Sequence, residues 1–323
     1  MLTAPDFQHK QIIFVFLSRG EALSFKNDNI IIKNEDGKIK HQSSCYKLFS
    51  LFVVGHITIT SGLLERSKRF GFNIIFMNHN LKTYGTWSNG AEGNFILRRK
   101  QYEYNKSEIA RQLVINKICQ QINALSKIRS RSDLKNRAIQ KLKNQKDYLI
   151  NKDFELDKLL GVEGNSAKIY FQALFEDFNW HSRKPRVKQD ITNCLMDIGY
   201  NLLFCFIEGL LSVYGFDVYI GVYHRQFFQR KSLVCDLVEP FRPIIDYAIY
   251  KAYKLNQIKQ EDFTIIQNQY NLYGKNATSY VNLILEKILK NKNEIFLYIQ
   301  SYYRFVMKED EINKFPFFDN FIT

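Results

Sequence analysis

The sequence has 323 residues and carries 46 Lys and Arg against 32 Asp and Glu, which gives a formal net charge of +14 at pH 7. This length allows two domains of ordinary size, and 46% hydrophobic residues can form a substantial core, which argues against disorder. The positive charge favours polyanionic partners over acidic proteins or neutral small molecules, with nucleic acid first and an anionic membrane surface second.

Cysteine usage and the apolar runs indicate the compartment. The five cysteines have no CxxC spacing, so we interpret them as buried reduced thiols of a cytoplasmic protein. They are Cys45, Cys119, Cys194, Cys205 and Cys235. The first apolar run, residues 12–17, is too short for a secretory signal. The longest run, residues 201–214, contains Glu208 and falls short of the roughly 20 residues of a membrane span, so it predicts a core helix and no membrane anchor.

Residues 1–90 are predicted to form a small β-rich domain. The predicted strands occupy residues 11–17, 22–25, 30–33, 55–60 and 72–77. Asp36-Gly37 lies between two strand-like runs and is typical of a hairpin turn. The segment from Ser61 to Gly71 predicts a short helix that ends at a C-cap glycine.

After a stretch rich in Gly, Ser and Asn at residues 84–94, the pattern becomes helical, and we place the domain boundary there. Apolar residues recur with helical spacing from Ser107 to Ile150 and again in later segments. These later segments are residues 165–178, 192–215, 232–254 and 277–305. The overall prediction is an α+β fold with a β-rich domain at 1–90 and a larger all-α domain at 91–323. The aromatic tail, residues 313–323, is expected to pack as an irregular strap or to contact a partner.

Glu163 is the first candidate functional residue. Ala167, Tyr170 and Leu174 follow it at i+4, i+7 and i+11, so they share its helical face, and that face is apolar. A carboxylate directed at a core is costly unless it is paired or coordinates a metal ion. The alternative is a first-turn glutamate stabilised by the helix dipole, because Glu163 is expected to open its helix.

Three more candidates follow a loop-like segment at residues 215–223. His224 precedes a basic run, where a single histidine is more often a hydrogen-bonded or surface group than a ligand. Asp236 and Glu239 are expected at i and i+3 on one face of a helix that Ser232 caps. Two negative charges at such a short distance are unfavourable unless a cation or an arginine lies between them.

Pro240 and Pro243 are expected to break this helix beside the two carboxylates. Such a break favours a functional site. The alternative is an ordinary charged helix start in which Arg242 neutralises Glu239 at i+3.

Two or three carboxylates with one imidazole suit Mg²⁺ or Mn²⁺ better than structural Zn²⁺, which needs spacings rich in Cys and His. The sequence contains no Walker-type Gly-Lys-Ser/Thr, no Gly-rich dinucleotide fingerprint and no Gly-x-Ser-x-Gly elbow. ATP hydrolysis and serine-hydrolase chemistry therefore have no support.

Four segments resemble, in order, the motifs of the CRISPR-associated integrase family Cas-one. They are residues 161–171, 193–203, 215–224 and 232–243. Residues 97–101 and 109–118 also resemble the family's domain-junction and first-helix patterns, so the resemblance covers most of the chain. One local departure is Phe227-Phe228, which is bulkier than the family pattern between the histidine and the last motif.

The resemblance implies a small N-terminal β-domain that mediates dimerisation and a larger helical catalytic domain. By motif position, it implies that Glu163, His224 and Glu239 bind Mg²⁺ or Mn²⁺ directly, and that Asp236 is a further catalytic residue that supports the ligands or positions DNA. The implied reaction is a transesterification in which the 3′-hydroxyl of a captured DNA fragment, the prespacer, attacks a phosphodiester at a CRISPR leader-repeat. The implied assembly is two homodimers bridged by a dimer of the small Cas-two protein.

Basic residues near these motifs are expected to hold the DNA phosphates. They are Arg98, Arg99, Arg225, Arg230, Lys231 and Arg242. A second basic cluster on a predicted helix is more often a solvated face. Its members are Lys127, Arg129, Arg131, Lys135, Arg137, Lys141, Lys143 and Lys146. Two alternative functions remain: a metal-dependent, structure-selective DNA endonuclease, and a non-enzymatic DNA-binding scaffold whose carboxylates only form ion pairs.

Overall fold

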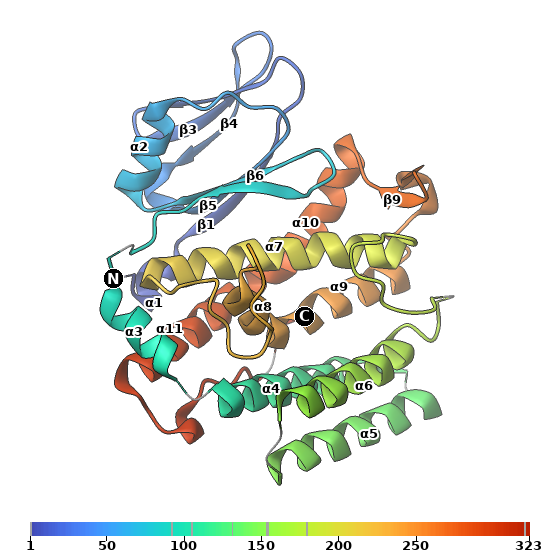
Figure 1. The fold of residues 1–323 in the computed structure, drawn as a ribbon. Helices are drawn as coiled ribbons and strands as arrows, with labels where there is room; N and C mark the ends of the chain where they lie inside the picture. Colours follow the sequence, from blue (N-terminus) through green and yellow to red (C-terminus); the bar gives the residue numbers. More distant parts are fainter. Residues whose placement is uncertain are drawn as a thin grey trace.

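The structure, a computed structural model, describes residues 2–91, 93–104, 106–130, 132–152, 155–178, 180–319 and 321–323. A strand-rich N-terminal region is followed by a mostly helical region, so the predicted α+β fold class is confirmed (Figure 1). The division into two domains at residue 90 stays a prediction.

The N-terminal strands form two sheets. The strands are β1 (Gln11–Phe16), β2 (Ala22–Lys26), β3 (Asn29–Lys33), β4 (Ile39–Ser44), β5 (Leu48–Val54), β6 (Asn73–Met77) and β7 (Thr83–Trp87). One sheet has the order β1-β5-β6-β7, with β5 parallel to both β1 and β6 and with β7 antiparallel to β6. The other sheet is the antiparallel set β2-β3-β4, and Gly37 has φ +76° in the predicted hairpin turn between β3 and β4.

The central strand β5 is buried along its whole length, because the larger sheet is covered on both faces. Leu51 and Val53 pack in a cluster with α2 (Ser61–Phe70), whereas Phe52 and Val54 belong to the main core shared with the helical region. The predicted strand at 55–60 is wrong. The strand ends before Gly55, whose φ of +116° favours glycine, and the preceding apolar run lacks the alternation expected of a half-buried strand. The predicted helix ending at Gly71 is confirmed, with Gly71 at φ +70°.

The remaining elements are mostly helical. The helices are α1 (Ala4–Gln8), α3 (Phe95–Glu103), α4 (Lys106–Ser126), α5 (Asp133–Ile150), α6 (Leu156–Leu174), α7 (Ile191–Tyr214), α8 (Ser232–Val238), α9 (Arg242–Lys254), α10 (Gly274–Lys290) and α11 (Lys292–Lys308). Short 3₁₀ turns are η1 (Cys45–Lys47), η2 (Glu239–Phe241), η3 (Gln260–Asp262) and η4 (Ile312–Lys314). A small hairpin, β8 (Thr264–Ile266) and β9 (Gln269–Asn271), was not predicted.

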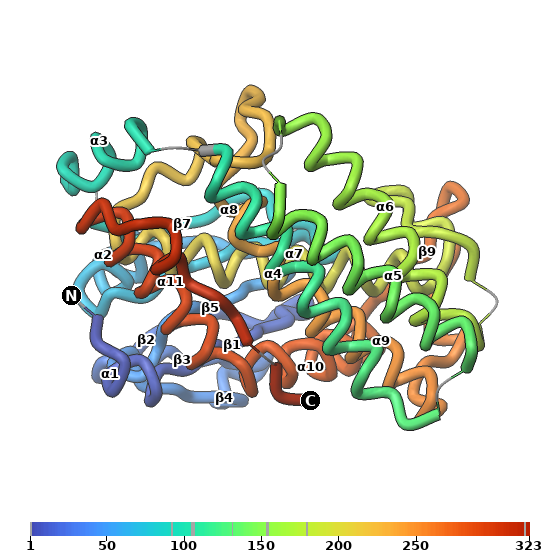
Figure 2. The backbone as a smooth tube through the Cα atoms, turned by 90° about the horizontal axis from the view of Figure 1, so that it is seen from below, coloured from blue at the N-terminus to red at the C-terminus, as the bar shows by residue number. Residues whose placement is uncertain are grey.

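Helix α7 runs between the larger sheet and the other helices, and α4, α5 and α6 pack together on its far side (Figures 1 and 2). Its length and composition would suit a membrane span, but 78% of its apolar window is buried inside the protein. It is therefore a core helix, as the sequence predicts.

Two long predicted helices are interrupted in the structure. Pro240 and Pro243 separate α8 from α9 by the 3₁₀ turn η2, as the sequence predicts. The predicted helix at 277–305 is wrong as a single element, because Asn291 ends α10 and precedes α11. The buried Asn291 side chain donates to the Lys287 carbonyl at 2.8 Å and accepts from the Ile322 N–H at 2.7 Å.

The aromatic tail packs as the predicted strap. Phe318 and Phe321 are buried in the main core, and the Phe318 ring lies 4.8 Å from that of Phe241 in η2. Asn116 in α4 holds the strap by donating to the Phe318 carbonyl at 2.8 Å and accepting from its N–H at 3.0 Å. The tail thus supports the turn that carries Glu239.

All five cysteines are free thiols, as predicted, although Cys119 and Cys235 are only half-buried. Burial raises the pKa of Cys194 and that of Cys205 to about 12, which keeps both protonated.

Candidate functional site

Glu163 lies in the middle of α6, which begins seven residues earlier at Leu156. The expectation that it opens the helix, and with it the dipole alternative, is therefore wrong. Its carboxylate Oε1 forms an ion pair with Nζ of Lys117 on α4. The partner that a carboxylate on an apolar face requires is thus present.

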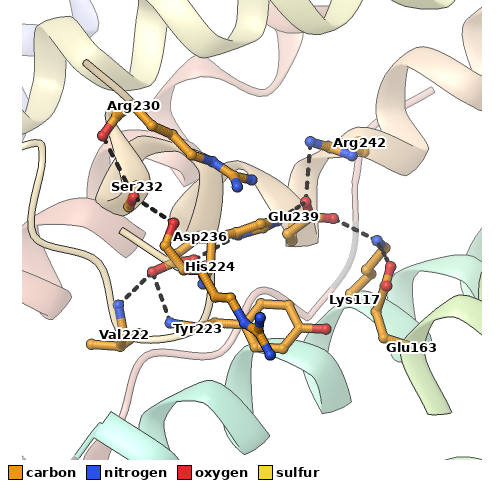
Figure 3. A network of polar contacts seen from close by, with 11 residues as sticks. Lys117, Glu163, Val222, Tyr223, His224, Arg230, Ser232, Asp236, Glu239 and Arg242 are labelled. Carbon is orange, nitrogen blue, oxygen red and sulfur yellow. Dashed lines mark hydrogen bonds and ion pairs between the residues drawn. The ribbon is translucent and has the colours of Figure 1, made fainter. Parts of the chain in front are cut away.

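Lys117 joins two carboxylates from different elements (Figure 3). Its Nζ also lies 2.5 Å from Oε2 of Glu239 in η2, and the Lys117 side chain is only 9% exposed. Burial disfavours the charged form of Lys117, but the attraction of the Glu239 and Glu163 carboxylates is stronger than this effect. The pKa of Lys117 is therefore raised. Lys117 was not among the functional residues predicted from the sequence. The sequence feature that could have identified Lys117 is its place between Val114 and Ile118 on a strongly apolar helix.

Glu239 also pairs with Arg242, whose Nη2 lies 3.1 Å from Oε1, as the i+3 spacing predicts. Burial disfavours the charged form of Glu239, but the attraction of Arg242, Lys117 and His224 is stronger than this effect. The pKa of Glu239 is therefore lowered. Glu239 therefore stays ionised although its side chain is only 5% exposed. Glu239 is thus a buried carboxylate with two cationic partners, Lys117 and Arg242.

Asp236 organises the loop that carries His224. Its carboxylate is fully buried and accepts from three successive backbone N–H groups, those of Val222 at 2.6 Å, Tyr223 at 3.1 Å and His224 at 2.8 Å. The loop comes this close because residue 221 is glycine, since a Cβ there would lie 2.5 Å from Oδ2 of Asp236.

Asp236 also sets the orientation of the imidazole. Nδ1 of His224 lies 2.7 Å from Oδ1 of Asp236, so we assign the proton to Nδ1. Nε2 then carries the free lone pair and lies 3.9 Å from Oε1 of Glu239. A carboxylate that fixes the tautomer of a ligating histidine in this way is common in metal sites.

Ser232 is not the N-cap that the sequence predicts. It is the first residue of α8, the N-cap position is Lys231, and the Ser232 hydroxyl donates to the Arg225 carbonyl at 3.4 Å. The hydroxyl therefore closes the base of the loop at residues 225–231.

The donor set fits a hard divalent cation. Among the described residues no three His, Cys, Asp or Glu side chains already form a metal cage. Glu163 and Glu239 nevertheless point at one common cation, the Lys117 ammonium, and His224 presents Nε2 beside Glu239. Carboxylate oxygens with an imidazole are ligands that suit Mg²⁺ or Mn²⁺.

A cleft of about 1060 Å³ opens beside this group, with Lys117, Glu163 and His224 in its lining. Seven other Lys and Arg residues also line it: Lys82, Lys168, Arg183, Arg186, Lys188, Arg230 and Arg242. Arg230 and Arg242 were predicted as DNA contacts. The basic run from Arg183 to Lys188 precedes α7 in the sequence and was not predicted to contact DNA.

The other predicted DNA contacts lie outside this lining. Arg98 donates to the Gly215 carbonyl at 3.1 Å, and Lys231 pairs with Glu208. Arg99 is exposed on α3, and Arg225 forms an exposed ion pair with Asp157 at 3.0 Å.

The second basic cluster is mostly solvated, as its spacing indicates. Arg129, Arg137, Lys141 and Lys143 are exposed, whereas Lys127 and Lys146 are half-buried. Lys135 is the exception, because it is buried and pairs with Glu176 and Asp177. Arg131 lies outside the described residues.

Asp246 is a further acidic residue in the cleft lining, and it is almost fully buried. It accepts a hydrogen bond from the Tyr200 hydroxyl. Burial raises the pKa of Asp246 to about 7, although Tyr200, Arg183 and Arg242 act in the opposite direction.

Because the folded protein holds this proton more tightly than the unfolded chain, Asp246 lowers stability as the pH rises from about 4 to about 7. We expect Asp246→Asn to increase the unfolding free energy at pH 8, by on the order of 4 kcal/mol at most, and to change it little at pH 4. Denaturant unfolding of both proteins across this range measures the difference. An equal pH dependence in the two proteins would contradict the assignment.

Comparison with known proteins places the chain in a family. The model of the family "CRISPR associated protein Cas1" matches residues 14–285, which is most of the chain. The chain belongs to the Cas1 family. The resemblance seen in the sequence motifs is thereby confirmed.

Curated members of the Cas1 family are similar over most of their length. "CRISPR-associated endonuclease Cas1 1" of Thermodesulfovibrio yellowstonii is 29% identical over 261 residues, covering 77% of this chain and 82% of the relative. The protein of the same name from Archaeoglobus fulgidus is 26% identical over 277 residues, covering 75% and 78%.

Solved structures share the fold. A Cas1 protein from Thermotoga maritima superposes with a TM-score of 0.79 at 20% identity, covering 92% of this chain and 97% of that one. A casposase bound to an integration product superposes with a TM-score of 0.78 at 18% identity, covering 93% and 92%. At these identities the likeness concerns the fold.

Proposed function

We propose that this member of the Cas1 family is a metal-dependent integrase of CRISPR adaptation, which joins the 3′-hydroxyl ends of a prespacer to the CRISPR leader-repeat. One observation carries the proposal: two glutamates from α6 and η2 pair with one cation, Nε2 of His224 lies beside the glutamate of η2, and Glu163 and His224 line a basic cleft. A phosphodiester of DNA held in this cleft would meet both the basic side chains and the ligand group.

Glu163, His224 and Glu239 would hold the Mg²⁺ or Mn²⁺ ion in this site. A bound divalent ion supplies stabilisation of the charge that develops on the attacked phosphate, and it makes a hydroxyl a better nucleophile. Asp236 acts as a positioning residue, since it holds the His224 ring through Nδ1 and its loop through three N–H groups. Arg242 supplies a fixed positive charge next to Glu239.

The proposed partners follow from the comparisons. A "Cas6-RT-Cas1--Cas2 complex" contains a chain of this fold, with a TM-score of 0.79 at 21% identity over 95% of the present chain and 36% of the other. Together with the casposase on its integration product, it supports DNA and Cas2 as partners. The assembly proposed for this chain is two homodimers bridged by a Cas2 dimer. The protein would act on DNA in the cytoplasm.

The names of the curated relatives favour a second candidate, a metal-dependent endonuclease that uses the same residues with water as the nucleophile. A strand-transfer assay separates the two. It combines a labelled duplex with free 3′-hydroxyl ends, a supercoiled plasmid carrying a repeat, and Mn²⁺ or Mg²⁺, with and without added Cas2. Label joined to the plasmid supports the integrase, metal-dependent cutting without joining supports the endonuclease, and binding without any product supports a scaffold.

The basic lining of the cleft predicts which residues bind DNA phosphates. We expect Arg186→Ala to weaken duplex binding and to reduce the slope of log affinity against log salt concentration by about 0.9, the value for one phosphate contact. Arg186 is exposed and lines the cleft. The matched control is Arg137→Ala, because Arg137 is exposed on α5 outside the lining. Fluorescence anisotropy titrations at several salt concentrations measure both slopes, and equal slopes for the two variants would refute the placement.

A further inference from the structure

The Tyr223 side chain is buried beside the candidate metal site, and its hydroxyl is unpaired. Tyr223 is only 4% exposed, and the residues that the structure describes offer its hydroxyl no hydrogen-bond partner. A buried tyrosine hydroxyl usually has a partner, because leaving it without one costs free energy. Phenylalanine would fill the same space without this cost. The packing of the ring therefore does not explain the hydroxyl.

The Tyr223 ring is held in one place. Its backbone N–H donates to Oδ2 of Asp236 at 3.1 Å and is one of the three N–H groups that this carboxylate accepts from. The ring also packs edge-on against the His224 ring, with 5.1 Å between the ring centroids. The hydroxyl therefore cannot reach solvent unless the loop that carries His224 also moves.

The Tyr223 hydroxyl points toward carboxylates of the site. In Figure 3 it lies on the side of the loop that faces Glu163 and Lys117. Burial, and after it the negative charges of Glu163, Glu239 and Asp236, raise the pKa of Tyr223. Among these carboxylates Glu163 acts most strongly. The hydroxyl therefore keeps its proton and is available as a hydrogen-bond donor next to Glu163.

Glu163 is also the carboxylate with most capacity to accept this hydrogen bond. Asp236 already accepts from three N–H groups and from an imidazole, and Glu239 is held by two cations. Glu163 pairs with Lys117 through Oε1. A divalent ion that displaces this lysine and binds one carboxylate oxygen leaves the other oxygen for the hydroxyl. Carboxylates that bind metal ions are commonly held by such hydrogen bonds.

We propose that Tyr223 is a positioning residue of the metal site, whose hydroxyl donates to the Glu163 carboxylate when that carboxylate binds Mg²⁺ or Mn²⁺ in place of Lys117. The proposal rests on the proposed function, because it takes Glu163 as a metal ligand. The hydroxyl destabilises the metal-free protein and supports the ligand in the metal-bound protein. Its removal should therefore weaken metal binding without weakening the metal-free fold.

The test compares the wild type with Tyr223→Phe, which removes only the hydroxyl. In the metal-free protein the melting temperature should stay the same or rise, because the substitution removes an unpaired buried group. Mn²⁺ should bind about 10-fold more weakly, a typical loss when the support of a metal ligand is removed. Thermal unfolding measures the first effect. Electron paramagnetic resonance of the free Mn²⁺ ion, without DNA, measures the second.

Tyr298→Phe is the matched control. Tyr298 on α11 is also 4% exposed, and its hydroxyl likewise has no hydrogen-bond partner within the described part of the chain. Its pKa is raised by burial and by the neighbouring Tyr302, and not by a carboxylate of the site. The substitution should act on the metal-free protein as Tyr223→Phe does and should leave Mn²⁺ affinity unchanged.

Three results would overturn the proposal. The first is equal Mn²⁺ affinity of Tyr223→Phe and the wild type, whether or not the variant binds DNA more weakly. The second is an equal loss of Mn²⁺ affinity in Tyr223→Phe and Tyr298→Phe, since this would be a general effect of packing. The third is a lower melting temperature of metal-free Tyr223→Phe, because the hydroxyl would then have a partner in the metal-free protein.

Failure of the proposed function gives a different result. A wild type that binds Mn²⁺ but joins no DNA would not be an integrase, and the comparison of Mn²⁺ affinities would still decide the role of Tyr223. A wild type that binds Mn²⁺ no better than Glu163→Ala would have no metal ion at Glu163, and both the proposed function and the role of Tyr223 would be refuted.

Discussion

Replacing His224 with alanine should reduce strand transfer by more than about 100-fold while changing DNA affinity by less than about two-fold. Loss of a residue that only supports a ligand typically costs about 10–100-fold, and loss of a ligand itself should cost more. DNA affinity should persist because the basic residues of the cleft lining remain in place. Glu163→Ala should behave in the same way. The assay is joining of labelled DNA to a plasmid in Mn²⁺, with affinity measured separately by anisotropy.

Two comparisons sharpen this prediction. Asp236→Asn keeps the shape of the side chain but removes its charge, so it should cost an intermediate factor of about 10–100. His41→Ala removes an exposed histidine on β4 and should leave joining unchanged. Full joining activity in His224→Ala or Glu163→Ala would refute the assignment of the metal ligands.

Lys117→Met should lower the unfolding free energy of the metal-free protein by about 3–5 kcal/mol at pH 7. Methionine fills a similar volume but leaves Glu163 and Glu239 without the ammonium that joins them. Breaking a buried ion pair on one side is costly because the remaining charge stays desolvated. Arg242 still contacts Glu239, which limits the loss.

The Lys117→Met variant should also respond more strongly to a divalent metal ion. In Lys117→Met, Mn²⁺ no longer competes with an ammonium for the two carboxylates, so it should raise the melting temperature more than it does in the wild type. Thermal unfolding with and without Mn²⁺ measures this difference. The control is Lys143→Met, which removes an exposed lysine on α5. Equal stability of Lys117→Met and wild type, or equal Mn²⁺ shifts, would show that the two glutamates do not share a cation site.

Local chemistry determined several elements from the sequence alone. A glycine that tolerates positive φ ends α2 at Gly71, and proline, which lacks an N–H group, separates α8 from α9. The apolar periodicity of α4 and α7 likewise identified helices and, with the β-rich start, the α+β class. These signals act within a few residues, so they can be recognised without knowing which segments pack together in the folded chain. Strand β5 was missed because burial on both faces removes the alternation that marks a strand.

The sequence also supplied Glu163, His224, Asp236 and Glu239 as residue types suited to a metal, but not the contacts among them. Only the tertiary structure decided that Lys117 lies between two glutamates and that Asp236 holds the imidazole through Nδ1. Glu163 and Lys117 are 46 residues apart, and their helices meet through packing, which no local pattern encodes. The sequence specifies the type and charge of each side chain. Whether two charges pair depends on the distance between them and on their desolvation, and both are set only when the chain folds.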